Sequence, residues 1–140
     1  MKTGKVGHWT GEELARIAQA DDLHVSPFRE DGVTYGTPTW VWCVVVGEAV
    51  YARAYHGGRS SWYQAALKQG AGRVRVAGIV RAAVFLSVPQ EDPVQEAIDG
   101  PYREKYQGSP YLKAMLSPRA RVATVRILTQ VATYPNYEEQ

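Results

Sequence analysis

The segment TPTWVWCVVVGEAVYARAYH (residues 37–56) constrains the fold of this chain more than any other. Apolar, β-branched and aromatic residues alternate on both sides of Gly47-Glu48, a pattern typical of a β-hairpin with a tight turn. A two-residue loop fixes the register. In that register the opposite pairs on one face are Val46–Ala49, Val44–Tyr51, Trp42–Arg53 and Trp40–Tyr55.

The two faces of this predicted hairpin differ in chemistry. One face is small and apolar, as in the interior of a small barrel, and consists of Val41, Cys43, Val45, Val50, Ala52 and Ala54. The other face carries two tryptophans, two tyrosines and a cation. Because a protein seldom leaves such a patch in water, we expect a helix, a second subunit or a planar ligand to cover it.

The rest of the chain predicts short helices between further strands. Helices are expected at 11–21, where Thr10 and Glu13 form a capping-box pattern, and at 62–69, 93–107 and 111–116. The helix at 93–107 is expected to be interrupted at Gly100-Pro101. Strands are expected at 23–29 and 119–128, and the segment 73–88 is expected to form either one long bent strand or two strands kinked at Gly78. The sum is a single mainly β (α+β) domain over residues 1–140, a six-stranded antiparallel barrel with short flanking helices and flexible ends at 1–8 and 130–140.

Composition narrows the classes of function. The chain has 140 residues, of which 45% are hydrophobic and 21% charged, and a formal net charge of +2. It lacks the dense basic stripe of a nucleic-acid-binding protein, and no apolar run is long enough to span a membrane. It starts without a signal peptide, and its single cysteine fits a reducing compartment. We therefore expect a cytoplasmic protein with no nucleic-acid or membrane partner.

The segment AYHGGRSSWYQAAL (residues 54–67) is the strongest candidate for a binding site. A strand, two glycines, Arg59, two serines and a helix start follow one another, which is typical of phosphate-binding junctions. The S-x-x-Q pattern from Ser61 predicts a capping box that uses this hydroxyl locally. The amides of residues 57–60 and Arg59 would then be available to an anion. An ordinary strand–helix turn is the alternative interpretation.

Other chemistries have little support in the sequence. His8, His24 and His56 are scattered and have no further ligand at metal-binding spacing, so no metal site is expected. Cys43 falls on the inward face and should be inert. Arg53, opposite Trp42, is either half of a structural cation–π pair or a ligand contact. No catalytic residue is identified.

The chain resembles the core of the flavin-binding split-barrel superfamily in the order of its strand, turn and helix signals over the segment TYGTPTWVWCVVVGEAVYARAYHGGRSSWYQAAL. That superfamily includes pyridoxamine-phosphate-oxidase-like proteins and deazaflavin-dependent reductases. A closer resemblance is to a bacterial family of unknown function among those barrels. It is carried by three segments, ADDLHVSPFREDGVTYGTPTW, GGRSSWYQAALKQGAG and YREKYQGSPYL. The resemblance covers most of the chain, from about Trp9 to Leu128.

This resemblance implies a split β-barrel that forms a homodimer and holds flavin mononucleotide (FMN) or a deazaflavin at the dimer interface. It also implies that Gly36, Thr37 and Pro38 open the first strand of the cofactor wall. The cofactor-binding residues that it suggests are Trp40, Trp42, Arg53, Tyr55, Gly57, Gly58, Arg59, Ser60, Ser61 and Trp62.

Three functions follow. The first is a flavin- or deazaflavin-dependent oxidoreductase that acts on a small organic substrate. The Asn-Leu of many deazaflavin-dependent members is Ala66-Leu67 here, which keeps a second function open. This second function is a cofactor-free small-molecule-binding or biosynthetic protein that uses the same aromatic pocket. In the third, the aromatic face is only the core of a dimer.

Overall fold

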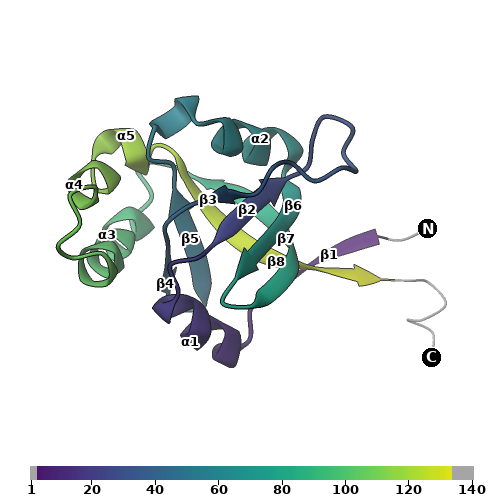
Figure 1. Ribbon diagram of the computed structural model, residues 1–140, viewed down its shortest axis with the longest axis horizontal. Coiled ribbons are helices and arrows are strands. Elements are labelled where there is room, and N and C mark those ends of the chain that lie inside the picture. Colours follow the sequence, from purple (N-terminus) through teal and green to yellow (C-terminus); the bar gives the residue numbers. More distant parts are fainter. Residues whose placement is uncertain (1–2, 134–140) are drawn as a thin grey trace.

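The computed structural model describes residues 3–133, which form one curled antiparallel sheet with helices at both ends and along one side (Figure 1). The strands are β1 (Thr3–Gly7), β2 (His24–Pro27), β3 (Thr39–Trp40), β4 (Cys43–Val46), β5 (Ala49–Arg53), β6 (Ala71–Val76), β7 (Ile79–Val88) and β8 (Thr124–Thr133). The helices are α1 (Gly11–Gln19), α2 (Ser61–Gln69), α3 (Val94–Lys105), α4 (Leu112–Met115) and α5 (Pro118–Arg121), with a 3₁₀ turn, η1, at Gly57–Arg59. No helix in this part of the chain is long and apolar enough to cross a membrane.

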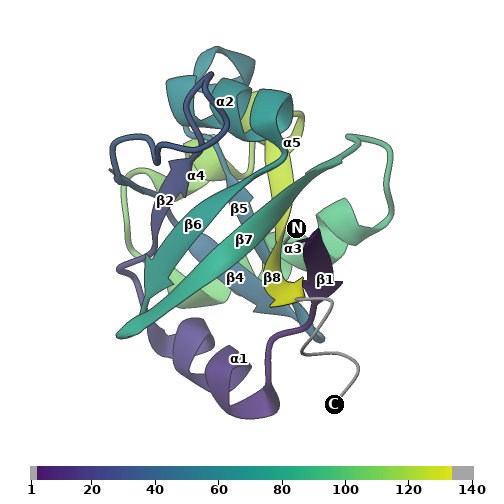
Figure 2. The ribbon, with the colours of Figure 1, turned by 90° about the vertical axis from the view of Figure 1, so that its right-hand side faces the viewer.

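The strand order makes the sheet curl almost into a barrel. The strands follow one another as β3-β2-β6-β7-β8-β5-β4, and β1 pairs with the far end of β8. Only Val41 and Trp42 separate β3 from β4 in the chain, so the two ends of the sheet meet there. We call these two residues the seam. The curled sheet confirms the expected α+β barrel-like class, with β6 and β7 on one side and α1 and α2 at opposite ends (Figure 2).

The expected number of six strands is wrong, because the described residues contain eight. The predicted strand before the turn is two strands, since Trp40 pairs with His24 of β2 whereas Cys43 pairs with Ala52 of β5. The strand at Thr3–Gly7 has no alternating apolar pattern, and so the sequence did not indicate it. It pairs with β8 up to Thr133, so two segments expected to be flexible are strands here. Residues 1, 2 and 134–140 of those predicted flexible ends lie outside the described residues.

The hairpin register is confirmed where the two strands pair. The pairs run from Cys43–Ala52 to Val46–Ala49 around Gly47, whose φ is +59°. The predicted opposition of Trp40 and Tyr55 is wrong, because the strands separate beyond Cys43. This separation opens the sheet next to the seam.

Both faces of the hairpin are buried over most of their length. Cys43, Val50 and Ala52 are fully buried in the main core inside the curl, as their small size predicts. On the other face, Val44 and Tyr51 pack in a second core under α3. Helix α3 therefore covers this part of the aromatic face.

The structure corrects or confirms four other expectations. The segment 73–88 is two strands joined at Ala77-Gly78, where both φ angles are positive. The predicted strand at 119–128 starts only at Thr124, because Ser117 caps the short helix α5. Helix α3 continues through Pro101, since Ile98 and Tyr102 are fully buried against the sheet and this packing outweighs the lost amide. The capping box of Thr10 and Glu13 is confirmed at α1.

Candidate functional site

A cavity of about 870 Å³ lies at the opening beside the seam. Its walls come from β3 and the seam, from the end of β5 with η1, from the first turn of α2, and from Tyr111 and Met115 near α4. This volume lies within the range of small-molecule sites, roughly 300–1,000 Å³. We call it the aromatic pocket.

Four of the predicted aromatic residues line this pocket, namely Trp40, Trp42, Tyr55 and Trp62. Trp42 stacks on Tyr106 with ring centroids 4.0 Å apart and planes 4° apart, so its orientation is fixed. Trp40 is 56% exposed, and its indole nitrogen donates a hydrogen bond to the carbonyl oxygen of Asp21. The pocket therefore has rigid aromatic walls, part of which face solvent.

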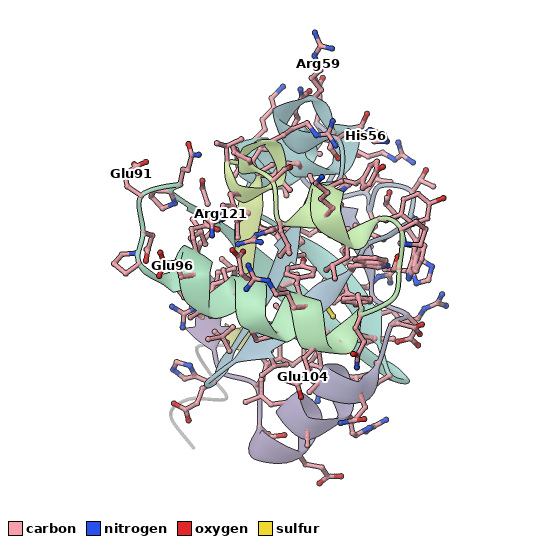
Figure 3. The ribbon with its side chains drawn as sticks, turned by 90° about the vertical axis from the view of Figure 1, so that its left-hand side faces the viewer. His56, Arg59, Glu91, Glu96, Glu104 and Arg121 are labelled. Carbon is pink, nitrogen blue, oxygen red and sulfur yellow. The ribbon has the colours of Figure 1, made fainter. Side chains whose placement is uncertain are left out.

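The side of the pocket formed by α2 is polar. Ser60, Ser61, Arg59 and His56 line it. His56 was absent from the predicted set, although it precedes the two glycines directly. Arg59 is exposed, and its side chain extends outward from the end of the fold (Figure 3). The pocket thus has hydroxyl groups inside and a cation at its rim.

The predicted capping box at Ser61 is wrong. The N-cap of α2 is Ser60, and no side chain caps this helix. The side-chain amide of Gln64 donates instead to the carbonyl oxygen of Gly58, at 2.9 Å. Ser60 is 8% exposed, and its side chain makes no capping hydrogen bond to α2. The hydroxyl of Ser60 therefore stands with uncapped helix amides at the pocket wall.

The two glycines of the junction have different roles. Gly57 has a φ of +68°, and a Cβ there would lie 2.6 Å from Cγ of Arg119. Its amide donates to the carbonyl oxygen of Ala54, and the amide of Ser60 donates to Gly57, so neither is available to an anion. Gly58 is exposed and has no such neighbour. Gly57 is thus explained by the turn, and neither glycine lines the aromatic pocket.

Arg53 is the centre of a buried hydrogen-bond network. Its guanidinium donates to the carboxylate of Asp99 at 2.6 Å and to the backbone carbonyl and side-chain oxygens of Gln95. It also donates to the carbonyl oxygen of Met115 and to the hydroxyl of Thr124. These five acceptors match the five N–H groups of an arginine. Arg53 borders the pocket, but its donors are used within the protein.

A second cation shares the carboxylate of Asp99. Arg121 of α5 forms an ion pair with its other oxygen, and Figure 3 shows Arg121 beside α3. Burial favours a higher pKa for Asp99, but the hydrogen bonds from Arg121 and Arg53 outweigh burial and lower the pKa below 3.8. Asp99 and Gln95 carry no sequence signal for this role, since both lie on a helix that reads as an amphipathic surface.

Two tyrosines, Tyr102 of α3 and Tyr106 at its C-terminal end, form hydrogen bonds with the backbone where the strands separate. The hydroxyl of Tyr102 accepts from the amide of Arg53 and donates to the carbonyl oxygen of Trp42, both at 3.0 Å. It therefore replaces the direct ladder bond that this pair would form. The hydroxyl of Tyr106 similarly bridges the amide and the carbonyl oxygen of Cys43. Burial raises the pKa of both tyrosines, so the hydroxyls stay protonated.

The fold and the pocket define an α+β protein whose curled antiparallel sheet is held open at a seam, next to an aromatic cavity. A family model for uncharacterised proteins conserved in bacteria (DUF2255) matches residues 13–127. The chain belongs to this family, which confirms the predicted relation to an uncharacterised bacterial family. The comparison with curated proteins gave no match, and neither did the comparison with solved structures.

Metal chemistry has no evident place in the described part of the chain. Among residues 3–133, no group of three or more His, Cys, Asp or Glu side chains is placed to hold a metal ion. The site is characterised instead by aromatic rings, hydroxyl groups and helix amides.

Proposed function

We propose that the aromatic pocket binds a planar, anionic cofactor of the flavin or deazaflavin type, and that the protein is an oxidoreductase for a small organic substrate. The observation that carries this proposal is the pairing of Ser60 with the uncapped start of α2 in a cavity lined by tryptophans. When bound, such a cofactor supplies hydride or electron transfer. The residues of this chain bind and orient it.

The two ends of the pocket suit the two parts of such a cofactor. Trp40 and Trp42 offer flat apolar surfaces for a ring system. The hydroxyl of Ser60 and the N-terminus of α2 offer hydrogen-bond donors to a phosphate, which also interacts favourably with the helix dipole. Arg59 stands at the rim, where a turn of its side chain would bring its charge to the same group.

We also propose that a second copy of the chain covers the open side of the pocket. Trp40, Tyr55 and Tyr111 are 56%, 37% and 57% exposed and line one cavity, so this chain alone leaves a partly exposed aromatic wall. Sedimentation velocity tests this: we expect a homodimer for the natural chain and a monomer for Trp40→Glu. A natural chain that sediments as a monomer at all concentrations would contradict it.

Spectroscopy and titration test the cofactor proposal. The purified protein is examined for flavin or deazaflavin absorbance and then titrated with FMN, with riboflavin and with a deazaflavin. We expect Ser60→Ala to weaken FMN binding about tenfold because a charge-assisted hydrogen bond is lost, and to leave riboflavin binding unchanged. Ser87→Ala, at an exposed position of β7, is the matched control. Absence of binding by every flavin refutes the proposal.

One observation favours a second function, the binding of a small planar molecule without a redox cofactor. Arg53 has its donors satisfied within the protein, and Arg59 extends outward, so neither guanidinium is directed into the pocket. A planar acid such as benzoate needs fewer contacts than FMN. Saturable binding of benzoate, without binding of FMN, riboflavin or a deazaflavin, would favour this second function.

A further inference from the structure

A second cavity adjoins the aromatic pocket. It has a volume of about 550 Å³ and lies between the loop of residues 28–39 and α2. Thr39, Ser61 and Trp62 line both cavities, so the first turn of α2 separates them by no more than one layer of side chains. We call this second cavity the polar groove.

The loop wall of the polar groove is fixed by internal hydrogen bonds. The carboxylate of Asp31 accepts from the amides of Val33 and Thr34, at 2.9 and 2.8 Å, and the amide of Arg29 donates to the carbonyl oxygen of Thr34, at 2.8 Å. The hydrogen bonds from the Thr34 side chain and from both amides lower the pKa of Asp31 to about 2. The carboxylate therefore stays charged, and the loop holds Arg29 at the groove.

The second wall comes from α2, and the charges across the groove are unequal. Two cations, Arg29 and Lys68, and one carboxylate, Glu30, line the polar groove. Glu30 lies 3.1 Å from Lys68, but both side chains are mostly exposed, so this pair is weak. Among residues 3–133, the guanidinium of Arg29 makes one long contact, 3.4 Å to the hydroxyl of Thr37. Arg29 is exposed, so most of its donors face solvent at the groove, and their fork matches the two oxygens of a carboxylate.

The geometry points to a carboxylate-binding site: we propose that the polar groove binds the carboxylate of a small organic acid, with Arg29 as its main partner. Lys68 and the hydroxyl of Thr37 stand beside it. Glu30 competes with such a ligand for one groove cation, because its carboxylate contacts Lys68. As a binding site the groove does not depend on the occupant of the aromatic pocket.

Titration of the full chain, followed by amide chemical shifts, tests this proposal. The probes are butyrate, its neutral analogue butyramide, and inorganic phosphate. We expect saturable shifts at Thr37, Gln64 and Lys68 with butyrate, and none with butyramide. Phosphate distinguishes a carboxylate site from a general anion site, and we expect it to bind more weakly than butyrate.

Variants assign the effect to named side chains. We expect Arg29→Gln to weaken butyrate binding at least fivefold, since it removes the fork of donors, and Glu30→Gln to tighten it about twofold, since it removes the internal competitor. Arg75→Gln, at an exposed arginine of β6, should change nothing.

The outcomes separate this proposal from the proposed function. Butyrate binding that needs Arg29 supports the groove even where no flavin binds. Equal shifts with butyrate and butyramide, phosphate binding as tight as butyrate, unchanged binding in Arg29→Gln, or no saturation at all would each overturn it, whatever the flavin titration gives.

Discussion

The hydroxyl of Tyr102 stabilises the opening of the sheet, and removing it should be costly. In Tyr102→Phe, the amide of Arg53 and the carbonyl oxygen of Trp42 each lose a partner, both at 3.0 Å, inside a region where Tyr102 is fully buried. A buried polar group without a partner costs about 1–3 kcal/mol. Two such groups give an expected loss of about 2–6 kcal/mol in the free energy of unfolding.

Urea unfolding and amide exchange measure this effect. We expect a lower midpoint with an unchanged dependence on urea, and faster hydrogen exchange at the amide of Arg53. Tyr111→Phe is the control, because Tyr111 is 57% exposed and its variant should stay within about 0.5 kcal/mol of the natural chain. If Tyr102→Phe were as stable as this control, with Arg53 still protected, the strands would have closed onto each other and the hydroxyl would not be holding them apart.

Three further predictions follow from buried groups. The pKa of Asp99 is lowered below 3.8 in the folded chain, so its ion pairs stabilise the fold fully above about pH 5. This stabilisation is lost as the pH falls through the folded pKa. The free energies of unfolding of the natural chain and of Asp99→Asn should therefore converge in acid. Gly57→Ala should cost about 1–3 kcal/mol in thermal or urea unfolding because of its positive φ and Arg119, whereas Gly58→Ala should be nearly neutral. Burial raises the pKa of the Cys43 thiol, so a thiol reagent should label it only at the rate of unfolding; rapid labelling of the folded chain would contradict this.

The hairpin could be predicted from the sequence because the residues that specify it are close together in the chain. Alternation and Gly47 determine the register from Cys43 to Ala52, and the small residues on one face determine which side points inward. It could not place Trp40, whose partner His24 lies in another strand. Pairing between strands that are distant in the chain depends on the whole sheet, so it cannot be predicted from a short segment of sequence.

The same distinction holds for the candidate site. The strand–glycine–helix pattern predicted Arg59 and Ser60, which line the pocket, because the junction is continuous in the chain, whereas Trp62 was suggested by the family resemblance. The role of Arg53 was left open between structure and ligand binding, and its network favours structure. The deciding partners, Asp99 and Gln95, are 46 and 42 residues away in the chain. Only the docking of α3 brings them to Arg53.

The tyrosine bridges have a consequence for the order in which the molecule assembles. The hairpin can form by itself, but Tyr102 and Tyr106 reach it across 49 and 63 residues of chain. Loops of that length close more slowly than a two-residue turn. The aromatic pocket should therefore form after the hairpin, and a ligand that binds there would report the docking of α3 rather than the formation of the turn. A newly made chain would thus remain unable to bind until residues 94–116 have docked.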